Sequence, residues 1–259
     1  MIDWINAGIL GIVQGLTEFL PVSSSGHLVV FQQFLTEEEV PVVFDIILHL
    51  GTLLPIVWIY RAKIIELFRI LFTNPLGPES RLGWFILLGS VPTALIGITL
   101  EDIFDQIFHT PMMVGIAFFI TGSFLFATQY IGQGNRDEAE MTWKDALIIG
   151  VVQGLAITPG ISRSGSTISV AMLLGLRRDL AAKYSFLLSI PAIVGGFILK
   201  GREIASANLD PLVLGVGFAT SALVGVFALQ VLLRLVNSGD FSKFAYYMWL
   251  ISVVAIFVL

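Results

Sequence analysis

The sequence has no cysteine among its 259 residues, which excludes disulfide bonds and thiolate metal sites. Charge is also scarce, because Asp, Glu, Lys and Arg make up 13% of the chain, where a soluble domain carries about 25%. So few charges argue against a soluble globule of this size, and the net charge of −5 leaves no basic face for a nucleic acid. No basic residue precedes Arg61, which argues against a cleavable signal peptide.

Hydrophobic residues make up 56% of the chain, and this composition indicates a polytopic membrane protein. A helix needs roughly 20 apolar residues to cross a bilayer, and six segments approach that length. We predict membrane spans at residues 42–60, 82–100, 111–131, 182–199, 211–233 and 243–259. The predicted fold class is therefore all-α, with the whole chain in one integral membrane domain.

Two further apolar stretches, residues 3–35 and 145–176, are broken in the middle. Pro21 and a run of serines interrupt the first stretch, and Pro159 with Gly160 interrupts the second. A proline inside an apolar helix removes a backbone hydrogen bond, and the freed groups need partners within the protein. We therefore predict two re-entrant helix–loop–helix hairpins, each of which dips into the membrane and returns.

The two broken stretches resemble each other in sequence. When residue n is aligned with residue n + 139, 8 of the 18 positions from Gly11 onward are identical. We assign residues 1–131 and 140–259 to two repeats, each a hairpin followed by three spans. Because three is odd, the second hairpin must start on the opposite side of the membrane. The repeat therefore has inverted topology, an arrangement known from transporters.

Basic residues indicate the orientation, because they gather in cytoplasmic loops. Eleven Lys and Arg residues fall on one predicted face, whereas Lys200 and Arg202 fall on the other. We expect the first face to be cytoplasmic in an inner (plasma) membrane, so both termini and the first hairpin face the outer side. We also expect a short amphipathic helix over residues 63–72 that lies on the cytoplasmic surface.

Three ionisable residues fall at membrane depth, where a charge is costly and indicates a functional site: Glu18, His27 and Arg163. Arg163 is too far along the chain from either surface to reach water, and its burial without an anion would be very unfavourable. Since the inverted repeat brings both hairpin tips to the middle, we expect Arg163 to meet Glu18 there. The other side chains expected around this pair belong to Ser24, Ser25, His27, Ser162 and Ser164.

This pattern of side chains favours an anion as ligand. The second helix of each hairpin begins after a Ser-x-Ser-Gly run, and its free N–H groups point to the protein centre. An arginine can hold two phosphate oxygens in a planar fork. Neighbouring Ser and His supply a nucleophile and a proton carrier, and Glu18 either ligates a divalent cation or transfers a proton. The chemistry indicated is phosphoryl transfer from a substrate whose other end prefers lipid.

Two motifs carry a family resemblance that covers essentially the whole chain in order and spacing. The segment Gln14-Gly-Leu-Thr-Glu18-Phe-Leu-Pro-Val-Ser-Ser24-Ser-Gly-His27 resembles the (E/Q)xxxE element and Ser/His loop of the undecaprenyl-pyrophosphate phosphatases, the bacitracin-resistance type. The segment Pro159-Gly160-Ile-Ser162-Arg163-Ser164-Gly-Ser-Thr167 is similar to their PGxSRSxxT element at every fixed position. The resemblance implies a membrane phosphatase whose substrate is a C55 polyprenyl diphosphate. Such an enzyme recycles the lipid carrier of cell-wall and glycan synthesis, and the resemblance also implies that it depends on Mg²⁺ or Ca²⁺.

The same resemblance implies roles for individual residues. Ser24 is the implied nucleophile, His27 its acid/base partner, and Glu18 the metal-associated carboxylate, while Arg163 serves both catalysis and binding. The other implied substrate-binding residues are amide and hydroxyl side chains of the two motifs, namely Gln14, Ser23, Ser25, Ser162, Ser164 and Thr167. Many family members have glutamate where this chain has Gln14, so the resemblance does not carry over a cation site with two carboxylates.

Structural interpretations of the same residues stay open. The serines also suit helix caps, and the Arg163–Glu18 pair also suits a structural salt bridge. Water activated by His27 or Glu18 is an alternative nucleophile. For Asp45 and His49, which lie in a predicted span, we favour hydrogen bonding between helices over a peripheral role in the site.

A second function also fits inverted repeats with broken helices. The alternative is a secondary transporter or flippase for a polyprenyl phosphate or another anion. In either case the expected partners are the lipid substrate and membrane lipid, without nucleic acid, and a homodimer is left open.

Overall fold

The computed structural model describes residues 2–35, 40–130, 132, 134–201 and 210–257. Its main helices are α1 (Trp4–Thr17), α2 (Ser24–Leu35), α3 (Val42–Thr73), α4 (Arg81–Thr99), α5 (Glu101–Phe108), α6 (Pro111–Ala127), α7 (Trp143–Leu155), α8 (Arg163–Leu173), α9 (Arg178–Leu199), α11 (Pro211–Ser238) and α12 (Phe244–Phe257). Short 3-10 turns lie at Pro78–Ser80, Thr128–Tyr130 and Asp240–Lys243. Over the described ranges the fold is all-α, as predicted, apart from one isolated bridge between Arg136 and Leu176.

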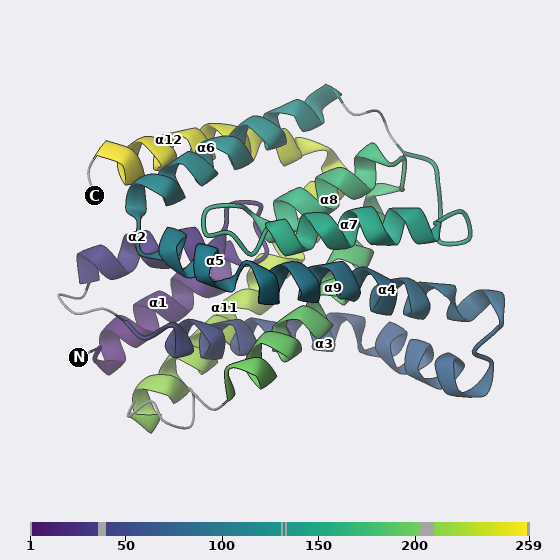
Figure 1. Ribbon diagram of the computed structural model, residues 1–259, viewed down its shortest axis with the longest axis horizontal. Helices are drawn as coiled ribbons and strands as arrows, with labels where there is room; N and C mark the ends of the chain where they lie inside the picture. The colour runs from purple at the N-terminus through teal and green to yellow at the C-terminus, as the bar shows by residue number, and fades with distance from the viewer. Residues whose placement is uncertain (1, 36–39, 131, 133, 202–209, 258–259) are drawn as a thin grey trace.

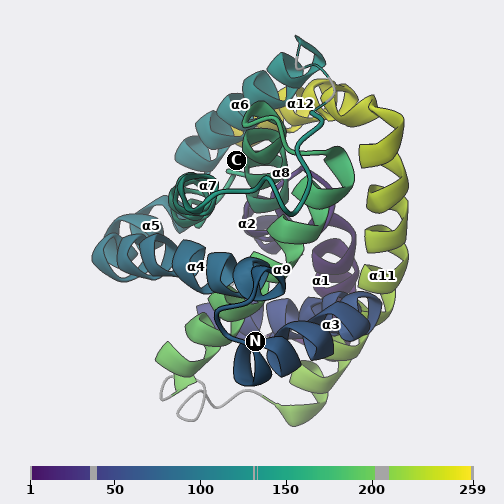
Figure 2. The same ribbon diagram turned by 90° about the vertical axis from the view of Figure 1, so that its right-hand side faces the viewer.

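The helices lie side by side along the long axis of the molecule (Figure 1). Both termini lie at one end of this bundle, and the turn from α3 to α4 lies at the other end. The pair α6 and α12 packs along one side. Seen from the end, α2 and α8 lie near the centre, with α4, α6, α11 and α12 around them (Figure 2).

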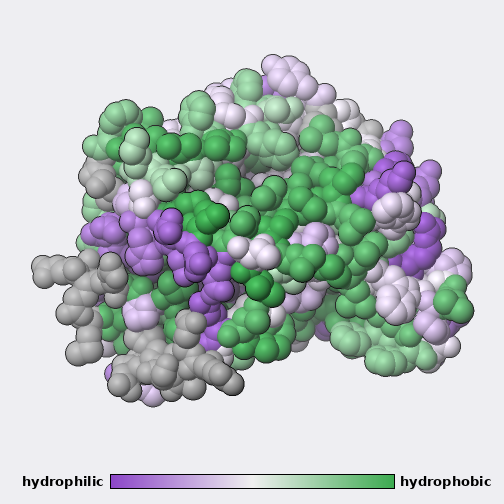
Figure 3. Space-filling model, viewed as in Figure 1, coloured by the Kyte–Doolittle hydropathy of each residue, from purple (hydrophilic) through white to green (hydrophobic). Residues whose placement is uncertain are grey.

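Five helical segments are long and apolar enough to cross a membrane, namely Val42–Thr73, Pro78–Thr99, Pro111–Tyr130, Arg178–Leu199 and Pro211–Ser238. Each overlaps one of the predicted spans. The sixth predicted span, residues 243–259, corresponds to a shorter apolar helix within Phe241–Phe257. In Figure 3 apolar residues form a band across the middle of the molecule, and hydrophilic residues gather toward its two ends. An apolar band of this kind on the face shown is typical of a membrane protein.

The segment predicted as a short amphipathic helix, residues 63–72, is helical, but it is the last part of a longer helix. The structure shows one continuous helix, α3, from Val42 to Thr73. No proline or glycine interrupts the chain between Arg61 and Thr73, so nothing ends the helix at the expected membrane surface. Residue 131, residues 258–259 and Arg202, which also entered the predictions, lie outside the described residues.

Both broken stretches form helical hairpins, as predicted. The first consists of α1 and α2, and the second of α7 and α8. Pro21 and Pro159 lie in the two connecting loops, where neither has to donate a helical hydrogen bond. The backbone of Gly160 is left-handed, with φ of 92°, which costs a glycine little. In Figure 1 the α1–α2 hairpin opens toward the terminal end of the bundle, and the α7–α8 hairpin opens toward the opposite end.

The first helix of each hairpin packs closely against a helix of the other half. On α1, Gly11 and Gly15 lie against the backbone of α11. On α7, Gly150 lies against the backbone of Gly89 in α4, and its carbonyl oxygen accepts a hydrogen bond of 2.8 Å from Thr93. The paired glycines therefore let α1 and α7 approach helices of the opposite half, which locks the two hairpins into one bundle.

We expect Gly150→Val to destabilise the fold, because a Cβ at this position would overlap the carbonyl oxygen of Gly89. Overpacking of this kind costs about 1–3 kcal/mol. Thermal unfolding of the detergent-solubilised protein should therefore occur at a clearly lower temperature. The matched control is Gly195→Val in α9, where an added Cβ meets no atom within 4 Å. Equal losses in the two variants would contradict the close α4–α7 contact.

Candidate functional site

The breaks of the two hairpins meet inside the bundle. Glu18 caps the C-terminus of α1, and Arg163 is the first residue of α8. Nη2 of Arg163 donates a hydrogen bond of 2.5 Å to Oε1 of Glu18. Only 16% of the Arg163 side chain and 6% of the Glu18 side chain are exposed. The expected meeting of these two charges is therefore observed, and it takes place largely out of water.

The other oxygen of Glu18, Oε2, collects three more side chains. Ser24 Oγ donates to it at 2.5 Å, and Gln14 Nε2 donates to it at 3.1 Å. Nε2 of His49 lies 3.5 Å from the same oxygen. One carboxylate thus links α1, α2, α3 and α8, and four polar side chains surround it.

Matching serines cap the second helix of each hairpin. Ser23 Oγ accepts from the backbone N–H of Gly26 at 3.4 Å, and Ser162 Oγ accepts from that of Gly165 at 3.0 Å. The repeat alignment pairs these two serines, and it also pairs Ser24 with Arg163. Equivalent caps therefore place a hydroxyl on one hairpin and a guanidinium on the other at the same helical position.

The two connecting loops are bonded to each other. The backbone N–H of Gly160 donates to Ser23 Oγ at 3.1 Å, and Ser164 Oγ donates to the carbonyl oxygen of Leu20 at 3.2 Å. From α6, Thr121 Oγ1 donates to the Gly160 carbonyl oxygen and accepts from the Ser162 N–H. Serines from both motifs thus hold the loops in register, so their structural interpretation as caps and ties is supported.

Three further predicted residues, like Ser23, Ser162 and Ser164, have their described contacts away from the Glu18 carboxylate. Thr167 Oγ1 donates to the carbonyl oxygen of Arg163 and lies 2.6 Å from Ser185 Oγ of α9. Ser25 is partly buried, and its hydroxyl lies 3.5 Å from that of Ser23. The ring nitrogens of His27 lie against the Ser23 carbonyl oxygen and against the hydroxyl of Tyr247. Neither of these described nitrogen contacts is with Ser24, its expected partner.

Two side chains outside the predicted site contact residues of it: His49 lies beside Glu18, and Tyr247 bonds His27. Asp45 does bond between helices, because Gln32 Nε2 of α2 donates to Oδ1 of Asp45 at 2.9 Å. His49, one turn later on α3, instead turns its Nε2 to Glu18. An ionisable residue inside a span was the available signal for His49. Tyr247 lies 220 positions from His27, and no motif connects the two.

Two buried polar atoms at the centre of the site have no hydrogen-bond partner among the described residues. They are Nη1 of Arg163 and Oε1 of Gln14. An unsatisfied buried donor or acceptor costs about 1–3 kcal/mol. A ligand with oxygens for the guanidinium and a positive or donor group for the amide oxygen would satisfy both atoms.

The described residues contain no cluster of three His, Cys, Asp or Glu side chains able to hold a metal ion. The site does offer the Glu18 carboxylate, and Gln14, whose Nε2 donates to that carboxylate, also carries an unpartnered amide oxygen. Carboxylate and amide oxygens suit Mg²⁺ or Ca²⁺. The residues therefore fit such a cation as a partial ligand set, which phosphate oxygens of a substrate would have to complete.

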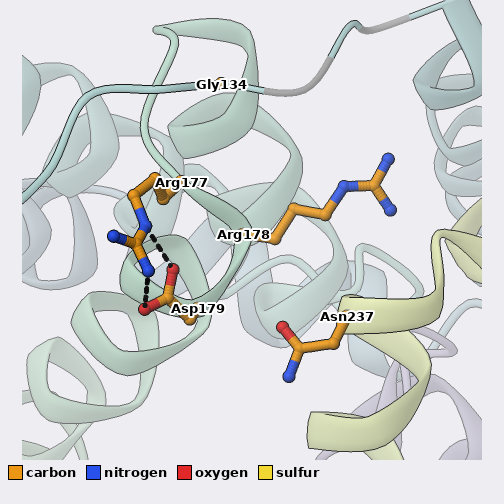
Figure 4. A pocket seen from close by; sticks show the side chains of 5 residues that line it. All are labelled: Gly134, Arg177, Arg178, Asp179 and Asn237. Atoms are coloured by element: carbon orange, nitrogen blue, oxygen red, sulfur yellow. Dashed lines mark hydrogen bonds and ion pairs between the residues drawn. The ribbon is translucent and has the colours of Figure 1, made fainter.

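A surface pocket of about 300 Å³ lies elsewhere, where α8 leads into α9 and where α11 ends (Figure 4). Its lining residues are Gly134, Arg177, Arg178, Asp179 and Asn237. Arg177 is already paired with Asp179 across the pocket wall. None of these residues belongs to either motif, so this pocket is distinct from the site at Glu18.

The whole arrangement falls within one known family. The chain matches the family model described as Bacitracin resistance protein BacA over residues 7–254, which include both hairpins. The chain belongs to the BacA family. The resemblance inferred from the two motifs is thereby confirmed, and every residue of the Glu18 cluster lies inside the matched range.

Three curated relatives of this BacA-family chain carry the same name. Undecaprenyl-diphosphatase from Desulfatibacillum aliphaticivorans is 43% identical over 265 residues, covering 96% of each chain. The protein of the same name from Carboxydothermus hydrogenoformans is 44% identical over 255 residues, covering 96% of this chain and 94% of the relative. That from Methanosphaera stadtmanae is 40% identical over 271 residues, covering 99% and 98%. The similarity therefore extends over the full length of these relatives.

We expect Glu18→Gln to destabilise the protein, because Arg163 would keep its buried charge without its carboxylate partner. Removing one member of a buried ion pair costs about 3–5 kcal/mol. The double variant Glu18→Gln with Arg163→Gln should recover part of this loss, which unfolding in detergent would measure. Additive losses in the double variant would mean that the two side chains are not coupled.

Proposed function

We propose that this BacA-family protein is an integral membrane undecaprenyl-diphosphatase. It hydrolyses the C55 polyprenyl diphosphate to the monophosphate and inorganic phosphate, which recycles the lipid carrier for cell-wall and glycan synthesis. The names of the three relatives support this activity. The observation in the site that supports it best is Arg163, buried beside the Ser24–Glu18 hydrogen bond with Nη1 still unpartnered.

The diphosphate binds where the N-termini of α2 and α8 meet. The free N–H groups and the positive dipole ends of both helices favour an anion there. Nη1 of Arg163 donates to a phosphate oxygen, while Nη2 stays on Glu18. The hydroxyls of Ser25 and Ser162 lie at the same two helix ends and suit further hydrogen bonds to phosphate. The lipid tail leaves the site toward the surrounding membrane.

Ser24 is the nucleophile in this mechanism. Its Oγ–H already donates to Oε2 of Glu18 at 2.5 Å, so the proton passes to that carboxylate as Oγ attacks the terminal phosphorus. The bond from that phosphorus to the bridging oxygen breaks, and the lipid monophosphate leaves with the bonding electrons. Water then attacks the phosphoserine, the phosphorus–Oγ bond breaks, and Ser24 regains a proton as phosphate departs.

The geometry favours Glu18 over His27 as the group that accepts the Ser24 proton. The described ring contacts of His27 are to Ser23 and Tyr247, whereas Glu18 holds the Ser24 hydroxyl directly. His49, whose side chain is 27% exposed, is the most open member of the cluster. Its Nε2 stabilises the negative charge of Glu18 when protonated. Water activated by Glu18 is the remaining alternative to a serine nucleophile.

Glu18 and Gln14 are the residues that would hold the divalent cation, with the diphosphate oxygens as its other ligands. When bound, Mg²⁺ or Ca²⁺ supplies neutralisation of the charge that develops on the phosphates. The repeat alignment supports a single cation position, because the residue equivalent to Glu18 in the second repeat is Ile157.

The membrane topology proposed is six spans and two re-entrant hairpins in an inverted repeat, with both termini and the first hairpin facing outward. Five long apolar helices and the shorter α12 support the six spans. Hairpins that open toward opposite ends of the bundle support the inversion (Figure 1). Association of two copies stays a prediction.

The transporter or flippase alternative is not favoured, because the curated relatives are named as diphosphatases. The deciding experiment gives the purified, detergent-solubilised protein a polyprenyl diphosphate and Mg²⁺ and measures phosphate release. Release should occur and should stop on chelation of the cation. Tight lipid binding without any release would favour the carrier instead.

Arg163→Lys should lower phosphate release by about 10²-fold or more, because a point charge cannot hold Glu18 and a phosphate oxygen at once. The matched control is Arg177→Lys, whose parent side chain lies on the surface and pairs with Asp179. Turnover at the wild-type level in the Arg163 variant would refute its phosphate-binding role.

Ser24→Ala should abolish turnover and any phosphoenzyme trapped by rapid acid quenching of the reaction. Ser25→Ala, one position along the same helix turn, should lower turnover through weaker phosphate binding but still form the phosphoenzyme, since its hydroxyl does not contact Glu18 in the described hydrogen bonds. Full activity of the Ser24 variant would replace the covalent mechanism by attack of water.

A further inference from the structure

His27 lies in a tight aromatic pocket between three helices. Only 1% of the residue is exposed. Its ring stacks on Tyr247 of α12, with centroids 5.6 Å apart and planes 9° from parallel. On another side it makes a T-shaped contact with the ring of Phe118 of α6, with centroids 5.2 Å apart. The position and tilt of this imidazole are therefore fixed by packing as well as by hydrogen bonds.

The two hydrogen bonds of the ring determine its tautomer. Nδ1 lies 2.8 Å from the carbonyl oxygen of Ser23, which can only accept, so Nδ1 carries the proton. Nε2 lies 2.6 Å from the hydroxyl of Tyr247. In a neutral ring Nε2 is the acceptor and Tyr247 the donor. No carboxylate bonds His27 among its described contacts, and such deep burial favours the neutral form.

The carbonyl group that His27 holds belongs to an unusual residue. Ser23 has a φ of 65°, and it is the one non-glycine residue with positive φ among the described residues. A left-handed backbone at a residue with a side chain needs support from its surroundings. His27 supplies that support at the carbonyl oxygen, and Gly160 supplies it at the hydroxyl. The peptide held in this way leads directly into Ser24.

We propose that Tyr247 is a positioning residue of the phosphatase site, acting through His27 and Ser23 to aim the Ser24 hydroxyl. The inference deepens the proposed function and rests on it. Tyr247 fixes the tautomer of His27, His27 holds the left-handed turn at Ser23, and the turn sets where α2 begins. In this arrangement His27 acts by position, because both of its nitrogens are already engaged.

The test compares variants that keep or remove single hydrogen bonds. Tyr247→Phe keeps the stacked ring but loses the donor, and we expect turnover to fall about tenfold with KM unchanged. His27→Asn keeps a donor near the position of Nδ1, so it should stay within about tenfold of wild type, whereas His27→Ala should lose about 10²-fold or more. Tyr247→Phe added to His27→Asn should cause no further loss, because His27→Asn has already removed Nε2, the atom that accepts the hydrogen bond from Tyr247.

Tyr246→Phe is the matched control on the same helix. Tyr246 packs against Phe126 and Trp249, away from His27, and should leave turnover unchanged. Thermal unfolding of each variant separates misfolding from mispositioning. Equal loss in His27→Asn and His27→Ala would mean that His27 carries a proton, and it would overturn the positioning role. So would wild-type turnover in Tyr247→Phe.

A second readout does not depend on activity. The chain has three histidines, so protein labelled with ¹⁵N-histidine gives few imidazole signals, and His27→Asn identifies the signal of His27. We expect that signal to report the Nδ1–H tautomer and to shift in Tyr247→Phe but not in Tyr246→Phe. An unmoved signal would overturn the proposal even if the enzyme is active. If wild-type protein releases no phosphate, the proposed function fails, while this spectrum still tests the Tyr247–His27 bond.

Discussion

A guanidinium carried to the middle of an apolar bundle must meet an anion there, and in this chain the partner is Glu18. The pair constrains the fold as much as the site, because each charge lies at the break of a different hairpin. Neither hairpin can slide along the bundle axis without separating the charges. The close glycine contacts of α1 with α11 and of α7 with α4 hold both breaks at the same depth.

The internal repeat supplies a scaffold, and departures from the repeat supply the chemistry. Ser23 and Ser162 occupy equivalent positions and cap their helices in the same way. The next position differs, with Ser24 in one copy and Arg163 in the other. An exactly repeated pair of serines or arginines would give two caps or two repelling cations. Because the copies differ at this position, the hydroxyl of Ser24 and the guanidinium of Arg163 face the same carboxylate.

The hairpins, the long apolar helices and the Glu18–Arg163 pair were predictable from the sequence, because proline breaks, apolar length and the cost of a buried charge are local or general effects. The partner of His27 was not predictable. Motif spacing placed Ser24 and His27 side by side, but on a helix residues three apart share a face without their side chains having to bond. The observed partner of His27 Nε2 is the hydroxyl of Tyr247, which lies 220 residues further along the chain. The continuity of α3 past the membrane surface was also missed, because apolar length predicts where a span can lie and not where a helix ends.

A structural salt bridge would account for the Glu18–Arg163 contact but not for what surrounds it. Packing in a structural network satisfies most buried donors and acceptors, since each one left over costs about 1–3 kcal/mol, and six buried side-chain atoms have no partner among the described residues. Here Nη1 of Arg163 and Oε1 of Gln14 are left unpartnered among the described residues, while a serine hydroxyl is drawn to the carboxylate between them. The unpaired donor is cationic, and a diphosphate is the ligand of the family that carries oxygens to match it. In the proposed function a diphosphate would give these unpaired atoms their partners, whereas a purely structural brace gives no reason for leaving them unpaired.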